Sequence, residues 1–179
     1  MRRLTLRNCK IGGTPGFPCL VVALQKNKSI QELDVGNTNL DVDNLIQLRI
    51  LLSENETLRE LNLDRPLLPG GQEEIASHVA DMLRQNNTLT SVSLKKFRLG
   101  DHGANEIAVA LRDNTALETL DVSSNDIGRD GAASFGEALK INRSLRRLNL
   151  NHNGIQDEGL LALVNSLLQV WPQPPALGA

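Results

Sequence analysis

One frame of apolar residues returns along the chain at a nearly constant interval. It is clearest when residues 117–127 are aligned with residues 145–155, because both segments read Leu-x-x-Leu-x-Val/Leu-x-x-Asn-x-Ile. Four further copies lie upstream, at residues 1–11, 30–40, 58–68 and 89–99. The spacings between successive copies are 29, 28, 31, 28 and 28 residues. A fixed period of this length predicts a solenoid of stacked units, in which each unit contacts only its neighbours.

Each copy is expected to begin with a short strand, because apolar residues at positions 4 and 6 of the frame alternate with polar ones. These pairs are Leu4/Leu6, Leu33/Val35, Leu61/Leu63, Val92/Leu94, Leu120/Val122 and Leu148/Leu150. Apolar residues at helical spacing follow each strand. In the fifth copy, Gly128 and Gly131 are expected to frame a turn, after which Ala132 and Phe135 face the core. The pattern predicts an α/β array with parallel strands on its concave face and helices on its convex face.

The strand–helix period, the Asn-x-x-Leu/Ile that leads into five of the strands and the Ile-Gly-x-x-Gly-Ala step at residues 127–132 resemble the ribonuclease-inhibitor type of leucine-rich repeat. That subclass includes ribonuclease inhibitor, the sensor arrays of NOD-like receptors, the GTPase-activating protein of Ran and the actin-binding cap of tropomodulin. The resemblance covers about residues 1–170, with six repeats starting near 1, 30, 58, 89, 117 and 145. It implies a right-handed, partial horseshoe used for protein binding. It transfers no functional residue, because the matching residues form the framework of the fold.

Asparagine stands three residues before the first apolar residue of five strands, at positions 27, 55, 86, 114 and 142. Four of these residues also match the sequon for N-glycosylation, Asn-x-Ser/Thr. Because all five occupy one place in the repeat, we interpret them as structural. Asparagine readily adopts the left-handed conformation that ends helices, so a helix-terminating turn is expected there.

The rest of the composition favours a cytoplasmic or nuclear protein. The net charge is −2, and Cys9 and Cys19 are too few for a disulfide scaffold. Neither a signal peptide nor a membrane-spanning stretch is recognisable, so no membrane partner is expected. Met1 already occupies an apolar strand position, which suggests a fragment or shortened product of a longer repeat protein. We expect the Pro-rich residues 171–179 to be disordered, although Trp171 could cover the end of the core.

The sequence offers no catalytic constellation. The glycine pairs lack the continuation of a phosphate loop, and the three histidines fall in three different repeats. We therefore predict a protein that is not an enzyme and has no cofactor, metal or small-molecule substrate.

Charge on the concave face is the main functional signal. Positions 2, 3, 5, 7 and 8 are expected to face the concavity, and their formal charges sum to +3, −2, 0, +2, −2 and +2 from the first to the sixth repeat. These bands of opposite sign could satisfy one another, or they could match a protein partner of complementary pattern. The candidate protein-binding residues are Arg59, Arg65, Lys95, Lys96, Glu118, Asp121, Arg146, Arg147 and His152.

No aromatic residue lies among these concave positions. A contact of moderate affinity, guided by charge, is therefore expected, because tight interfaces usually use aromatic anchors. Nucleic acid is not an expected partner, because stacking platforms are absent and acidic bands interrupt the basic ones.

The third repeat departs from the frame. Position 9 normally carries an asparagine or cysteine that bonds to the main chain, but Pro66 and Phe97 stand there in the third and fourth repeats, and Thr38 can make only part of the bonding. Residues 64–71 form either a drifted turn or a projecting binding loop. The primary functional hypothesis is a protein-interaction scaffold. The alternatives are a GTPase-activating regulator of a small GTPase and the ligand-sensing array of a NOD-like receptor.

Overall fold

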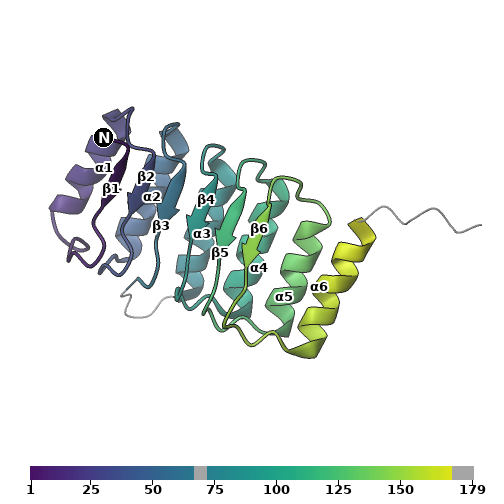
Figure 1. Ribbon diagram of the computed structural model, residues 1–179. Coiled ribbons are helices and arrows are strands. Elements are labelled where there is room, and N and C mark those ends of the chain that lie inside the picture. Colours follow the sequence, from purple (N-terminus) through teal and green to yellow (C-terminus); the bar gives the residue numbers. More distant parts are fainter. Residues whose placement is uncertain (67–71, 171–179) are drawn as a thin grey trace, which may run out of the picture.

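Six strand–helix units follow one another along the chain in the computed structural model, which describes residues 1–66 and 72–170 (Figure 1). The strands are β1 (Arg3–Thr5), β2 (Glu32–Asp34), β3 (Glu60–Asn62), β4 (Ser91–Ser93), β5 (Thr119–Asp121) and β6 (Arg147–Asn149). The helices are α1 (Gly16–Lys26), α2 (Val42–Glu54), α3 (Gln72–Gln85), α4 (Gly100–Asp113), α5 (Arg129–Leu139) and α6 (Gln156–Val170). The units match the copies of the sequence frame.

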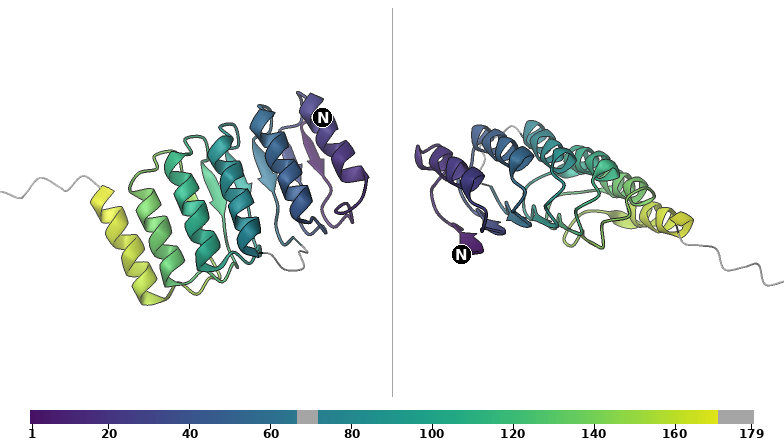
Figure 2. Two further views of the ribbon diagram at one scale, coloured as in Figure 1. Left: turned by 180° about the vertical axis from the view of Figure 1, so that it is seen from behind. Right: turned by 90° about the horizontal axis from the view of Figure 1, so that it is seen from above.

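All six strands form one parallel sheet in the order β1-β2-β3-β4-β5-β6. The register aligns the same repeat position in neighbouring strands, as in the pairs Leu33↔Leu61 and Leu120↔Leu148. A constant period thus becomes a constant register. The helices form a second layer on one side of this sheet, which leaves the other side uncovered (Figure 2). The predicted α/β solenoid, with strands on its concave face, is confirmed.

The core is a line of apolar layers between the sheet and the helices. The middle residue of each inner strand points into it, as Leu61 and Val92 do with 2% of their surface exposed. Phe17 and Phe135, each 0% exposed, fill the space beneath the first and fifth helices. At about 2 kcal/mol for each fully buried large side chain, these layers provide the main stabilisation of the stack.

Asparagines that precede strands bond each repeat to the one before it. At the end of the fourth repeat, Nδ2 of Asn114 donates to the main-chain oxygens of Leu83 at 2.6 Å and Asn86 at 3.1 Å. Its Oδ1 accepts from the main-chain N–H of Ala116 at 3.0 Å and Leu117 at 2.7 Å. The asparagines with this double role have exposed fractions of only 2–8%; they are Asn55, Asn86, Asn114 and Asn142.

The carbonyl that accepts from each amide lies in the last turn of the helix one repeat earlier, α1 for Asn55 and α2 for Asn86. Asn55 donates to Leu24 at 3.0 Å, and Asn86 donates to Leu52 at 2.7 Å. Carbonyls in a last helical turn have no partner within their own helix. The asparagine of one repeat therefore satisfies a main-chain group of the previous repeat. Asn27 makes only the local half of the pattern, accepting from the main chain of Ser29 and Ile30.

The structural interpretation of these asparagines holds, but the predicted backbone conformation is wrong. Asn27, Asn55 and Asn114 have φ between −83° and −75° and ψ between 119° and 130°, which is extended and not left-handed. The chain must run directly from the helix toward the next strand, and an extended residue supplies that direction.

The sequon-like hydroxyls also have a structural role. Thr88 Oγ1 donates to the main-chain oxygen of Asn55 at 3.3 Å, and Ser144 Oγ donates to that of Asn114 at 3.2 Å. Satisfying main-chain groups of the preceding repeat therefore accounts for both ends of the Asn-x-Ser/Thr pattern.

Position 9 behaves as its residue types predict. Asn125 Nδ2 donates to the main-chain oxygen of Leu94 at 2.8 Å, and its Oδ1 accepts from the main-chain N–H of Phe97 at 2.8 Å. Thr38 bonds only locally, through Oγ1 to the carbonyl of Val35 at 2.6 Å. Phe97 is buried with 4% exposed, so it exchanges the polar role of this position for an apolar one.

Glycines in the later helices allow close packing between neighbouring helices. Gly103 and Gly131 lie inside α4 and α5 and do not frame turns, which corrects the prediction for Gly131. A Cβ on Gly131 would lie 2.9 Å from Cβ of Ala104 in the previous helix, and one on Gly103 would lie 3.1 Å from Cβ of Ala76. The Gly-Ala step is thus a helix-packing signature in these repeats.

The sixth helix has an apolar face that the described part of the chain leaves uncovered. Leu160, Leu161, Val164, Leu167 and Leu168 lie at helical spacing on α6 and are 41–59% exposed. Residues 171–179, including Trp171, lie outside the described residues, so their predicted disorder and covering role stay predictions.

Candidate protein-binding surface

The open face of the sheet is polar, and its floor carries more acidic than basic side chains. Positions 3 and 5 of each strand flank a core residue, so they point away from the helices. A shallow hollow of about 120 Å³ lies over β1–β4 on this face. It is lined by Arg3, Glu32, Leu33, Asp34, Glu60, Leu61, Asn62, Ser91 and Ser93.

Several of the charge bands predicted for this face are joined by ion pairs. Arg3 Nε lies 3.3 Å from Glu32 Oε2, and Arg7 Nε lies 3.0 Å from Asp34 Oδ2. At the other end of the sheet, Arg146 Nε lies 3.8 Å from Glu118 Oε2, and both side chains are largely exposed. Neighbouring bands therefore partly satisfy one another, with small gains in stability at such exposed positions.

Arg7 spans three repeats and organises the end of the sheet where β1–β3 finish. Its Nη2 also lies 3.2 Å from Asp64 Oδ2. The hydrogen bond to Asp34 raises the pKa of Arg7, against the opposing effect of burial, and Asp64 raises it further. Arg7 therefore stays cationic at any usable pH. Gly36 leaves room for this guanidinium, because a Cβ there would lie 2.7 Å from Nη2.

Replacing Arg7 by methionine should lower the free energy of unfolding by at most about 1 kcal/mol, because the ion pairs are partly exposed. The difference from wild type should shrink in about 1 M NaCl, where screening weakens the pairs. Urea unfolding at low and high salt measures both effects. Arg2→Met, at an exposed residue of the same repeat, is the control. Equal losses in the two variants, or a loss independent of salt, would contradict this account of Arg7.

A second hollow lies at the C-terminal edge of strands β1–β4 and is strongly basic. We call it the basic hollow; it has a volume of about 380 Å³ and is lined by Arg7, Asn8, Asn37, Asp64, Arg65, Lys95 and Lys96. Four cations against one carboxylate give this lining a formal charge of +3. Asp64 is held at its base, because it pairs with Arg7 and accepts from the main-chain N–H of Lys95 at 3.0 Å.

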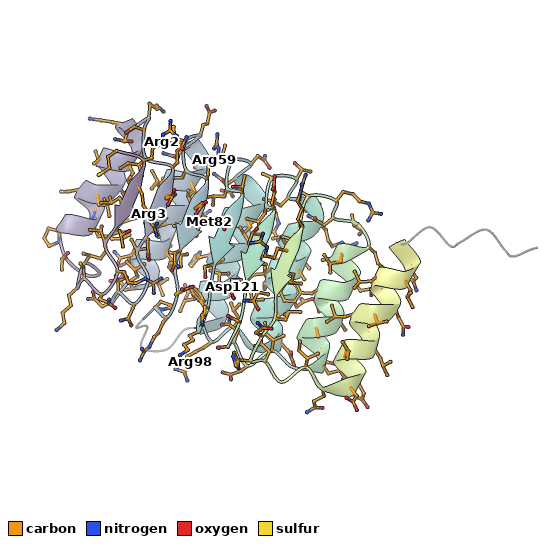
Figure 3. All side chains as sticks on the ribbon, in the orientation of Figure 1. Arg2, Arg3, Arg59, Met82, Arg98 and Asp121 are labelled. Atoms are coloured by element: carbon orange, nitrogen blue, oxygen red, sulfur yellow. The ribbon has the colours of Figure 1, made fainter. Side chains whose placement is uncertain are left out.

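The structure brings together only some of the candidate residues. Arg65, Lys95 and Lys96 meet in the basic hollow. Arg59 lies near the opposite, N-terminal edge of the sheet (Figure 3), where its Nη1 donates to the main-chain oxygens of Glu56 and Thr88.

The remaining candidates lie on β5 and β6 and beside them. Asp121 is on β5 (Figure 3), and its Oδ2 accepts from Asn149 Nδ2 at 2.9 Å. Arg147 is exposed at the start of β6, and His152 is exposed in the turn that follows it. These residues, and the ion-paired Glu118 and Arg146, do not line the basic hollow.

Position 7 was expected to face the concavity in every repeat, but in two repeats it does not. Gly36 and Ser123 at this position are buried, and Ser123 is only 2% exposed. The main-chain N–H of Ser123 donates to Oδ1 of Asp121 at 2.8 Å, so this aspartate also holds the turn after β5. The buried position is thus occupied by a small residue in these two repeats, whereas Lys95 and Asn151 are exposed at the same position.

Four further residues line the basic hollow but were absent from the candidate residues: Arg7, Asn8, Asn37 and Asp64. The sequence feature that could have identified them is their place at positions 7 and 8 of the first three repeats, level with Lys95 and Lys96. Only part of the possible loop at residues 64–71 can be placed, because residues 67–71 lie outside the described residues.

Residues 1–66 and 72–170 contain no group of three or more His, Cys, Asp or Glu able to hold a metal ion. None of their helices has both the length and the apolar character that crossing a membrane demands. Cys9 and Cys19 are both free and exposed.

Comparison with known proteins agrees with this geometry. The family model described as "Leucine Rich repeat" matches residues 113–136 and 142–164, which belong to the last two units. The fold is a leucine-rich repeat solenoid. Mouse leucine-rich repeat-containing protein 34 is 34% identical over 74 residues, which are 41% of this chain. The match covers only 18% of that relative's length.

Two solved structures share the leucine-rich repeat fold across nearly the whole chain. Leiomodin-1 actin-binding site 2 superposes with a TM-score of 0.62 at 20% sequence identity, over 95% of this chain and 80% of the other. The tropomodulin C-terminal domain of Caenorhabditis elegans gives a TM-score of 0.59 at 16% identity, over 95% of this chain and 84% of the other. At these identities the likeness establishes the fold alone.

Proposed function

We propose that this leucine-rich repeat chain is a non-enzymatic interaction module of the ribonuclease-inhibitor type, which binds a protein partner on its concave strand face. The observation that carries the proposal is the continuous uncovered face of the sheet, with polar side chains in register across six strands and the basic hollow at one edge. Loops and helices bury the other surfaces of the strands, so this face offers a broad, preformed area for a partner.

Two further features bear on where such a module works and how tightly it binds. Exposed thiols at Cys9 and Cys19 are compatible with a reducing compartment, the cytosol or the nucleus. No aromatic side chain lines either hollow, so the contact should be polar and of moderate affinity.

Blocking the concave face should abolish binding. Ser91→Arg/Thr119→Arg places two long cations side by side in the middle of the sheet, since Ser91 and Thr119 are paired neighbours. His102→Arg/Val109→Arg adds the same number of arginines to exposed positions of α4. Immobilised wild type should capture a discrete protein from cell extract, and the α4 variant should retain it while the strand variant loses it.

Circular dichroism should first show that both variants are folded. A captured protein that is lost with the α4 variant and kept by the strand variant would place binding on the convex face and contradict the proposal. Failure to capture any protein that depends on the strand face would also contradict it.

Actin is the first named protein to include in this test, because one of the two similar structures is described as an actin-binding site. Cosedimentation of wild type with actin filaments, with the strand variant as control, measures this directly. Pelleting of wild type but not of the strand variant would identify actin as the partner of the concave face.

A further inference from the structure

The basic hollow contains cationic side chains that take no part in the ion pairs of the described residues. Within the described part of the chain, Arg7 is engaged with two aspartates, whereas Arg65, Lys95 and Lys96 form no ion pair. All three of these side chains are exposed. Like charges gathered at one edge repel one another, so the cluster contributes nothing favourable to folding.

Two of these cations also stand where the backbone disfavours them. The residue at position 8 of every repeat adopts a left-handed conformation, with φ from 47° at Arg65 to 64° at Asn8. Asparagine tolerates this conformation best among non-glycine residues, and Asn8 and Asn37 occupy it in the first two repeats. Arg65 at 47° and Lys96 at 55° occupy it in the third and fourth at greater cost. Arg65 and Lys96 thus carry unpaired charge into the hollow in spite of an unfavourable backbone conformation, which indicates that they bind a ligand there.

We propose that the basic hollow binds a short acidic segment of a protein partner, a proposal that rests on the proposed interaction function and specifies the partner's chemistry. Arg65 and Lys96 lie at the same position of neighbouring repeats, about 5 Å apart at their backbones. Carboxylates at alternate residues of an extended peptide lie about 7 Å apart. Long, flexible cationic side chains span that difference. Asn8 and Asn37 place amides beside them; Asn37 Nδ2 donates to Asn8 Oδ1, and the amide of Asn8 keeps its Nδ2 donor for the peptide main chain.

The surroundings favour an acidic peptide over a nucleic acid. Asp34 and Glu60 line the neighbouring hollow on the floor of the sheet, where a continuous phosphate backbone would be repelled. No aromatic side chain lines the basic hollow for bases to stack on. A peptide whose charge is confined to a few residues can lie along the basic edge without crossing the acidic floor.

A separation-of-function variant tests the proposal without risk to the fold. Arg65→Asn/Lys96→Asn removes two cations and inserts the residue that Asn37 already shows to suit this conformation. Stability should therefore be unchanged or higher. The matched control is Lys28→Asn/Arg143→Asn, with the same charge change at exposed residues just before β2 and β6, near the opposite edge.

The probe is a fluorescein-labelled peptide of alternating glutamate and aspartate, about six residues long and flanked by glycine; its neutral counterpart carries the amides. Fluorescence anisotropy should show wild type binding the acidic peptide and not the neutral one. Affinity should fall about tenfold in Arg65→Asn/Lys96→Asn and stay within about twofold in the control variant. Binding should weaken between about 50 mM and about 300 mM NaCl.

Three outcomes would overturn the proposal. They are no binding of the acidic peptide, equal losses in the two variants, and tighter binding of a single-stranded RNA of about twelve nucleotides that Arg65→Asn/Lys96→Asn abolishes. Capture of a protein through the strand face can still succeed if this peptide fails. Failure of this inference is therefore distinguishable from failure of the proposed function.

Discussion

Replacing Asn114 by alanine is expected to lower the free energy of unfolding by about 3–5 kcal/mol, although it removes a side chain of moderate size. The asparagine makes four hydrogen bonds to main-chain groups of three repeats, and only 2% of it is exposed. Alanine would leave two carbonyls and two N–H groups without partners in a place that water reaches poorly. Each such orphan costs about 1–3 kcal/mol. Urea unfolding followed by circular dichroism gives the difference.

Asn27→Ala is the matched control for that experiment. Asn27 has the same place in its repeat, but its side chain bonds only locally, to Ser29 and Ile30, and it is half-buried. Its loss should cost about 1 kcal/mol. Similar losses for Asn27→Ala and Asn114→Ala would show that the bonds to the preceding repeat contribute little.

Asn114→Asp separates the two roles of the amide. The aspartate keeps an acceptor for Ala116 and Leu117 but turns a carboxylate toward the carbonyls that received Nδ2. Burial against acceptors raises the pKa of a carboxyl group, so the folded variant binds its proton more tightly than the unfolded chain. Stability lost at neutral pH should then partly return as the pH falls toward about 4.

These asparagines show how far the sequence predicts this fold. Their recurrence at one place in the period identified them as structural, and the period also predicted the strands and their parallel stacking. The bond from Asn114 to Leu83 was not predictable, because it joins residues of successive repeats whose spacing depends on how the helices pack. The left-handed conformation predicted for these asparagines was also wrong, because the direction of the chain between helix and strand depends on how the helices pack. Left-handed residues occur instead at position 8, at the other end of each strand.

The candidate site was predictable in composition but not in grouping. The sequence placed Lys95 and Lys96 on the concave side, and they do lie at its edge. It could not show that Arg7 reaches across to Asp64, because the two are 57 residues apart and a glycine between their strands makes the space. Once that pair is in place, Arg65 and its two lysine neighbours are the charges left over. Which charges remain unpaired depends on side-chain reach, which the period does not encode.

Acidic and basic side chains on the concave face are separated both from strand to strand and along the strands. The predicted bands alternate from strand to strand, and the ion pair of Arg3 with Glu32 joins two of them. Along the strands, acidic side chains such as Glu60 lie on the floor and Arg65 lies at the C-terminal edge. Under the proposed function, a partner would have to match both patterns, and the face would then discriminate between orientations of a bound protein as well as between partners.

The largest effect on the first repeat is expected from Gly12→Ala. A Cβ on Gly12 would lie 1.8 Å from the main-chain oxygen of Asn39 and 2.7 Å from the main-chain nitrogen of Leu40. No change of side-chain rotamer can relieve a clash with backbone. The main-chain atoms of Gly12 also exchange two hydrogen bonds with the Asn39 amide, at 3.0 and 2.9 Å, and any movement apart would weaken these bonds too. The cost should be about 3 kcal/mol or more.

Because a solenoid is stabilised by contacts between neighbours, this substitution should release the first repeat and leave the later ones folded. Hydrogen exchange should show β1 and α1 losing protection while β4 and β5 keep theirs. Gly16→Ala is the control, because the nearest atom to its Cβ is Thr14 Oγ1 at 3.6 Å and it begins a helix. Wild-type protection of β1 in Gly12→Ala would show that the first two repeats are less closely joined than this contact requires.

If the first repeat is released, Arg7 is withdrawn from Asp64. Affinity for an acidic peptide should then change as well, which would link the packing of Gly12 to the basic hollow.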